Sequence, residues 1–124
     1  MPKYAALIYG EQIPDGEWEP DPEQMAAVMA EYNEFGEWAG NRIIASEALQ
    51  GPETATTIRV EGGKGGNLVT SDGPFAETKE VLGGFYIFEA SDLDDAVKTA
   101  ARIPGAWEEG GKIEVRPVWE IPEM

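Results

Sequence analysis

The segment "TSDGPFAETKE" (Thr70–Glu80) concentrates side chains that could do chemistry. Asp72 and Glu77 are candidate catalytic carboxylates, because a carboxyl group can transfer protons or orient a substrate. Phe75 and Lys79 add an aromatic surface and a cation within the same few residues, and both are candidate ligand-binding residues. The segment could therefore form one wall of a small-molecule site.

The local backbone pattern favours a turn that exposes Asp72. Asp-Gly is a turn signal, and Pro74 has no backbone donor, so a strand ladder should break there. Such a break would leave the Asp72 carboxylate and nearby amides available, and Phe75 would anchor the turn in the core. The alternative is a merely polar turn, in which Asp72 accepts from its own turn amides and Lys79 pairs with a neighbouring acid.

Glu47 is a second candidate catalytic carboxylate. It lies in "IIASEAL", a segment otherwise suited to burial, where a charge needs a partner or a water-lined cavity. Arg59 and Arg116 are candidate partners in an exposed cross-strand ion pair. The alternative is a polar pocket between the sheet and the first helix, with Glu47 and Asp72 as acid and base and Arg59 binding an anionic group.

Tyr32 and Tyr86 could line the same pocket. Each has an apolar ring and a hydroxyl that needs a hydrogen-bond partner when buried, so both also suit an ordinary core position. The sequence alone leaves both interpretations open.

The amino-acid composition narrows the chemistry. There is no histidine and no cysteine, so any catalysis must use carboxylates, tyrosines, lysines or arginine. The loop "DGEWEPDPE" lacks the ligand spacing of a calcium loop, and "EGGKGG" lacks the Ser/Thr and helix of a phosphate loop. We therefore expect no metal and no cofactor.

The charge balance disfavours two kinds of partner. Twenty-four acidic against nine basic residues give a net charge of −15, and the basic residues are scattered along the chain. We expect no direct nucleic-acid binding and no adhesion to anionic membranes, since both would be repelled. The longest apolar run is only Tyr4–Tyr9, which predicts a cytoplasmic protein, and the length predicts a single domain over residues 1–124.

Hydrophobic periodicity predicts six strands and two helices. Residues 3–10 and 83–90 are apolar on both alternating faces, which is typical of central strands. The first helix should begin at an Asp21 cap, carry an apolar stripe that includes Met25, Met29 and Phe35, and end at Gly40. The second should begin at a Ser91 cap, end near Ile103 and carry an apolar stripe made of Leu93, Ala96, Val97, Ala100 and Ala101.

The remaining predicted strands lie at residues 42–49 and 112–121, and "ATTIRV" and "NLVTS" form a hairpin at residues 55–71. Without that hairpin, the order is that of a ferredoxin-like β-α-β-β-α-β sandwich, an α+β fold with an antiparallel sheet. Right-handed crossovers put both helices on one face. The other face of the central strands would remain apolar and bare, which predicts a homodimer packed sheet to sheet.

The sequence resembles the YCII-related family and, through "LVTSDGPFAETKEVLGGFYIFEASDLDDAVKTAARIP" and "GKIEVRPV", its DGPF branch. The resemblance covers nearly the whole chain and implies a dimeric α+β barrel. Some members of the wider family resemble small-molecule enzymes that use a His-Asp pair, which this histidine-free chain cannot form.

The resemblance leaves the question of enzymatic activity open. The first hypothesis is a small-molecule site near the DGPF segment. The alternative is a non-catalytic accessory protein beside an extracytoplasmic-function sigma factor, because genes of the DGPF branch commonly lie next to such factors. A third hypothesis is that the segment only shapes the dimer.

Overall fold

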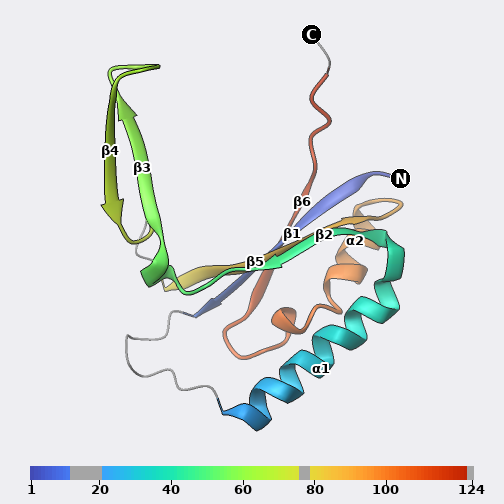
Figure 1. Cartoon of the computed structure of the whole chain (residues 1–124). Helices are drawn as coiled ribbons and strands as arrows, with labels where there is room; N and C mark the ends of the chain where they lie inside the picture. The colour runs from blue at the N-terminus through green and yellow to red at the C-terminus, as the bar shows by residue number, and fades with distance from the viewer. Residues whose placement is uncertain (12–20, 76–78, 123–124) are drawn as a thin grey trace.

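The computed structural model describes residues 1–11, 21–75 and 79–122 (Figure 1). Three short 3₁₀ turns accompany the main elements, of which the third, η3 (Pro104–Ala106), borders the site described below. The strands and helices in chain order are β1 (Lys3–Glu11), α1 (Pro22–Ala39), β2 (Ile43–Ala48), β3 (Thr56–Glu61), β4 (Asn67–Asp72), β5 (Glu80–Glu89), α2 (Leu93–Ala100) and β6 (Lys112–Pro117).

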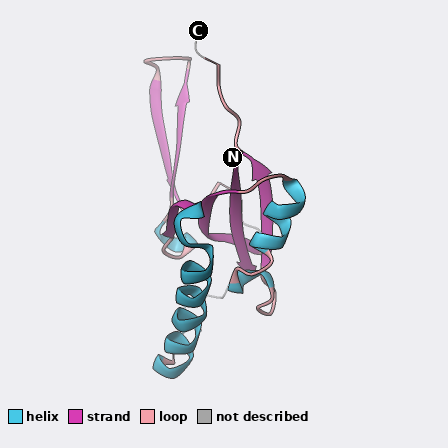
Figure 2. Ribbon diagram, turned by 90° about the vertical axis from the view of Figure 1, so that its right-hand side faces the viewer, coloured by secondary structure: helices cyan, strands magenta, loops and turns pink. Residues whose placement is uncertain are grey.

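Four strands form one antiparallel sheet in the order β2-β5-β1-β6. This confirms the ferredoxin-like α+β fold, with the two doubly apolar strands β1 and β5 at its centre. Figures 1 and 2 show α1 and α2 on the same side of this sheet. β6 is an edge strand that ends at Pro117, as expected for a residue without a backbone donor.

The predicted hairpin forms a separate two-stranded sheet of β3 and β4. Its base is closed where the Gly73 N–H donates to the Ala55 carbonyl oxygen at 2.7 Å and the Thr57 hydroxyl donates to the Gly73 carbonyl oxygen at 2.8 Å. Gly73 has φ +93°, a conformation that favours glycine. The glycine of the DGPF segment is therefore required by the base of the hairpin.

Helix α1 has the predicted ends but buries less of its apolar stripe than expected. The Asp21 carboxylate accepts from the Glu23 N–H at 3.0 Å, and Gly40 follows the last helical residue with φ +58°. Phe35 is buried, whereas Met25 and Met29 are exposed. The C-terminal half of α1 thus packs on the sheet, and its N-terminal half does not.

Helix α2 begins one residue later than the sequence suggested. Its cap is Asp92, whose carboxylate accepts from the Asp95 N–H at 2.8 Å, so the prediction of a Ser91 cap is wrong. Ser91 instead donates its N–H and hydroxyl to the Asp95 carboxylate. Of the predicted stripe, Ala96 and Ala100 are buried, whereas Leu93 and Val97 are about half exposed, contrary to the prediction. The face that packs on the sheet carries smaller residues, namely Ala96, Thr99 and Ala100.

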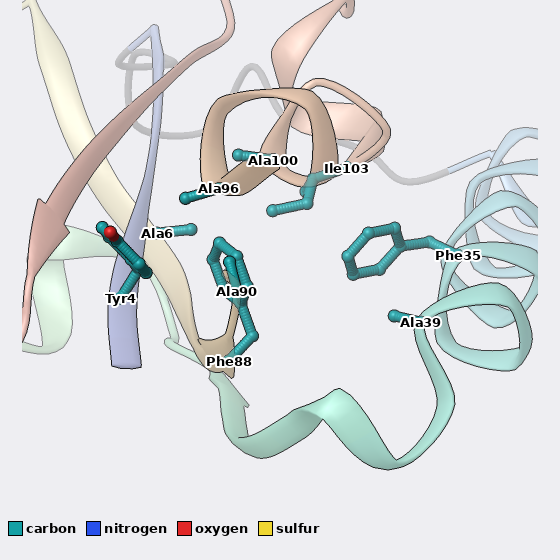
Figure 3. Packing of buried hydrophobic residues seen from close by; sticks show 9 residues of the cluster. All are labelled: Tyr4, Ala6, Phe35, Ala39, Phe88, Ala90, Ala96, Ala100 and Ile103. Carbon is teal, nitrogen blue, oxygen red and sulfur yellow. The ribbon is translucent and has the colours of Figure 1, made fainter. Parts of the chain in front are cut away.

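The core lies between the sheet and the two helices (Figure 3). Phe35 meets the Tyr86 ring edge to face, with 5.1 Å between the ring centroids. Small residues on α2 let that helix approach the sheet closely. The buried members of this core are Tyr4, Ala6, Phe35, Ala39, Phe88, Ala90, Ala96, Ala100 and Ile103.

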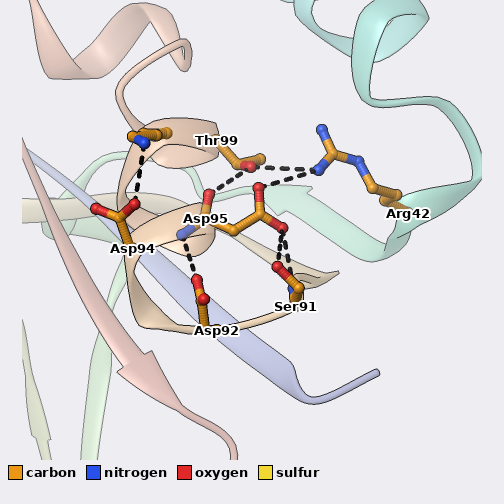
Figure 4. A network of polar contacts seen from close by, with 7 residues as sticks. Arg42, Ser91, Asp92, Asp94, Asp95 and Thr99 are labelled. Carbon is orange, nitrogen blue, oxygen red and sulfur yellow. Dashed lines mark hydrogen bonds and ion pairs between the residues drawn. The ribbon is translucent and has the colours of Figure 1, made fainter.

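A polar cluster joins the end of α1 to α2 (Figure 4). Arg42 Nη1 lies 3.8 Å from Asp95 Oδ1 and donates to the Thr99 hydroxyl at 3.4 Å. The guanidinium groups of Arg42 and Arg102 also lie over the Trp38 ring, at 4.8 and 3.9 Å from its centroid. These contacts hold the two helices in register on the sheet. Neither helix of the described chain is long and apolar enough to cross a membrane.

Asp95 should make folding stability depend on acid pH. Hydrogen bonds from Ser91, first of all its backbone N–H, lower the pKa of Asp95 below its ordinary value of 3.8, and Arg42 acts in the same direction. As the pH falls, the Asp95 carboxylate of the unfolded chain is therefore protonated before that of the folded chain. The stabilisation from Asp95 is present above pH 4 and is lost as the pH falls through the folded-state pKa.

We expect Asp95→Asn to lower the free energy of unfolding at neutral pH and to match the wild type at strongly acid pH. Urea unfolding across a pH series measures this difference. Asp94→Asn is the control, because Asp94 makes only an exposed pair with Lys98 at 2.9 Å. A wild-type advantage over Asp95→Asn that is the same at every pH would contradict the assignment.

Candidate functional site

A groove of about 1390 Å³ lies between α1 and the helix-facing side of the sheet. On α1 it is lined by Val28, Met29 and Tyr32, which belong to the part of the stripe that the sheet does not fully cover. The turn η3 and the residues that follow it close one end. A groove of this size can hold a small organic molecule.

The strand register explains why the groove lies at this end of the core. Tyr4, Phe88 and Ile43 align across three strands, and these bulky side chains belong to, or pack against, the core cluster that includes Phe35 and Ala39 of α1. Further along the same three strands and on the same face, Gly84 of β5 lies between Ile8 of β1 and Ala48 of β2.

Gly84 leaves the floor of the groove open. A Cβ atom on this residue would lie 2.8 Å from the Glu47 carbonyl oxygen, so a side chain would disturb the pairing of β2 with β5. With glycine there and alanine beside it, Ile8 is the one residue of this aligned row that carries a bulky side chain. The core is therefore filled at one end and hollow at the other.

Tyr32 and Tyr86 both line the groove and both pack against the core cluster, so the structure is compatible with each of the two interpretations left open by the sequence. Burial raises the pKa of Tyr32 to about 12, with Glu108 and Tyr86 acting in the same direction and the Gly105 backbone opposing them. Burial also raises the pKa of Tyr86. Both phenols are therefore protonated at neutral pH and can donate hydrogen bonds, but cannot act as bases.

The ionisable residues that line the groove, within the described part of the chain, are all acidic apart from three tyrosines, Tyr9, Tyr32 and Tyr86. None of the lining residues is a lysine or an arginine. These acids are Glu11, Glu37, Glu47, Glu53, Glu108 and Glu109. The groove thus combines apolar walls with negative potential and neutral hydroxyl donors.

Glu47 borders the groove at the β2 edge, but its pairing with Phe85 places its side chain on the sheet face that carries no helix, and the structure does not bring it together with its predicted partners. β2 and β6 are opposite edges of the sheet, so Glu47 cannot pair with Arg116 within one chain. Arg116 Nε instead lies 3.2 Å from Glu114 Oε1. Arg59 and Asp72 lie on the separate hairpin and do not line the groove.

The DGPF segment lies at the base of the hairpin, outside this groove. Asp72 is exposed at the end of β4, and none of the described residues donates a hydrogen bond to its side chain. Phe75 is 92% exposed, so the prediction that it anchors the turn in the core is wrong for the single chain. Pro74 ends the ladder and lets the chain leave the hairpin, which carries Phe75 away from the core.

The charged residues after the DGPF segment only partly match their predicted pairing. Glu77 lies outside the described residues. Lys79 makes no ion pair with a described residue, whereas its neighbour Glu80 forms an ion pair with Lys112 of β6. The roles predicted for Asp72, Glu77 and Lys79 in binding or catalysis therefore stay predictions.

Sequence reasoning missed Glu108, Gly84 and the open end of α1. Glu108 lies in an irregular segment whose position depends on how η3 packs, so no local pattern marks it. Gly84 sits in an apolar strand, where an internal glycine can indicate a close backbone approach. No group of three or more acidic side chains within the described ranges is arranged to hold a metal ion.

The fold and the groove define a ferredoxin-like α+β protein with an unfilled pocket between helix and sheet. Residues 3–122 match the model of the YCII-related domain, and the chain belongs to that family. It is also 33% identical over 121 residues to an uncharacterized protein of Rhizobium meliloti (strain 1021), covering 93% of this chain and 90% of that protein.

The buried phenol of Tyr32 should titrate well above an ordinary tyrosine. Because its folded-state pKa is raised from 10 to about 12, the stabilisation is present below pH 10 and is lost as the pH rises from 10 towards 12. The difference in tyrosinate absorbance between the wild type and Tyr32→Phe reports the ionisation of Tyr32. We expect this difference to appear with a midpoint near pH 12. Circular dichroism at each pH checks that the chain is folded, and a midpoint near 10 in folded protein would contradict the burial of this hydroxyl.

Proposed function

We propose that this protein is a homodimer whose protomers each bind a small, largely apolar molecule in the groove between α1 and the sheet. The observation that carries the proposal is the hollow end of the core. Natural cores are packed to the density of organic crystals, so an unfilled space beside exposed Met29 and half-buried Val28 costs stability unless something occupies it. A bound molecule would supply the missing contacts.

The groove favours a neutral or cationic ligand over an anion. An anionic group would meet several carboxylates and no lining cation, which is unfavourable in a partly desolvated site. An ammonium or hydroxyl group could instead approach the Tyr32 hydroxyl and the Glu108 carboxylate, which are close enough for Glu108 to affect the pKa of Tyr32. This differs from the earlier hypothesis that Arg59 binds an anionic group.

Binding is better supported than catalysis. The groove phenols of Tyr32 and Tyr86 keep their protons at neutral pH, and the chain has no histidine. A proton transfer would have to use one of the glutamates, without the acid–base pair on which catalysis of this kind usually relies. The sigma-factor partner implied by the family resemblance stays a prediction.

The homodimer rests on the sheet face that carries no helix. Ala5 pairs with Ile87 and Leu7 with Phe85 on this face, and all four are only partly buried in the single chain. Charged residues of the edge strands, including Glu47, border this apolar centre. An apolar centre with a polar rim is the usual anatomy of a protein interface.

Blocking the groove should abolish binding. We expect naphthylmethylamine to bind at least about tenfold more tightly than naphthylacetate, a difference of about 1.4 kcal/mol. Ala48→Trp should weaken the amine at least tenfold, because the indole would occupy the space above Gly84. Fluorescence titration measures both. The matched control is Ala27→Trp, an exposed α1 position outside the groove. Equal binding of amine and carboxylate would refute the proposed selectivity.

Changing the bare sheet face should dissociate the dimer. Leu7→Glu removes an apolar contact worth about 1.5 kcal/mol or more from each copy, so the dissociation constant should rise at least about a hundredfold. Sedimentation equilibrium of the wild type and the variant measures this change. Glu31→Gln, on the exposed surface of α1, is the control. A wild-type chain that sediments as a monomer at every concentration would exclude the homodimer.

A further inference from the structure

The β3–β4 hairpin stands clear of the rest of its own chain. Neither strand pairs with the four-stranded sheet, and Figures 1 and 2 show the hairpin rising from the side of that sheet that faces away from α1. An isolated two-stranded ribbon is marginally stable at best in water. Something outside the single chain is therefore needed to hold this one.

The two faces of the hairpin differ in character. Residues that pair across the strands share a face, which places Ile58, Val60 and Leu68 together on one side. Ile58 and Leu68 are 65% and 67% exposed. The other face pairs Arg59 with Val69 and is otherwise polar. The ribbon thus presents an apolar strip that no described residue of its own chain covers.

We infer that this hairpin is a dimerisation arm, whose Ile58, Val60 and Leu68 face packs against a second copy of the chain. The inference rests on the homodimer proposed above and adds a second contact region to it. Because the arm rises on the side of the bare sheet face, a copy seated on that face would lie beside it. Phe75, at the base of the arm, is also exposed.

The area of the sheet face favours this arrangement. Four strands about 4.8 Å apart, paired over roughly six residues of about 3.3 Å each, present only on the order of 400 Å². Each partner in a stable interface of standard size buries about 800 Å². The sheet face has a small footprint, and an arm reaching over the partner would add to the area that the two copies bury.

The charge of the arm also fits an acidic partner such as a second copy. Residues 55–73 contain two basic side chains, Arg59 and Lys64, and two acidic ones, Glu61 and Asp72, so their net charge is 2 − 2 = 0. All fifteen net negative charges of the chain therefore lie outside the arm. A neutral arm can lie against an acidic copy without the repulsion that opposes other contacts between two such chains.

Adjacent residues on opposite faces of β4 provide a matched test. In the full chain, we expect Leu68→Glu to raise the dimer dissociation constant at least about a hundredfold, since two arms each lose a buried leucine. Val69→Glu, which places the same charge on the polar face, should change it less than about threefold. Sedimentation equilibrium measures the dissociation constants, and circular dichroism checks the fold of each variant.

A shortened arm provides a second test that does not depend on a charge. Thr57 and Ser71 face each other in the ladder, so Asn-Gly can replace residues 58–70 as a two-residue hairpin turn. We expect this chain to keep its four-stranded sheet and helices, and to dimerise at least about a hundredfold more weakly.

The outcomes separate the two proposals. If the wild type is a dimer that Leu7→Glu dissociates, while Leu68→Glu and the shortened arm dimerise normally, the arm is refuted and the homodimer stands. A wild-type chain that is monomeric at every concentration refutes both. Equal weakening by Leu68→Glu and Val69→Glu also refutes the arm, because packing of one apolar face requires the two faces to differ.

Discussion

Two helices can cover only one face of a four-stranded sheet, and this constraint governs the rest of the molecule. β1 and β5 are apolar on both faces, so the face with Leu7 and Phe85 has no cover within the chain. The hydrophobic effect penalises such a surface in proportion to its area. The proposed homodimer and the proposed arm are both responses to this uncovered surface.

On the covered face, the size of the side chains decides where the core is full. The row of Tyr4, Phe88 and Ile43 belongs to the packed core, whereas Gly84 and Ala48 border the groove at the other end. The Arg42–Asp95 cluster and the stacked Trp38 hold α1 and α2 together at the filled end. The same helix can therefore pack firmly at one end and border a groove at the other.

Much of the architecture was predictable from local patterns. Alternating apolar residues identified the central strands, and the Asp21 and Gly40 signals identified both ends of α1, because these depend on residues adjacent in sequence. The α2 cap was misplaced by one residue, since Ser91 and Asp92 are both good caps and only the position of Asp95 selects between them. Phe75 was misplaced because the direction in which the chain leaves Pro74 is not a local property.

The sequence by itself determined the fold class, the family, the absence of histidine chemistry and the excess of apolar surface over what two helices can cover. Only the tertiary structure decided that Tyr32 and Tyr86 share a groove with Glu108, and that Asp72 and Arg59 lie apart from it on a separate ribbon. The physical reason is the distance along the chain over which each signal acts. Periodicity and capping act over a few residues, whereas a site depends on strand register and on side-chain volumes brought together from distant parts of the chain.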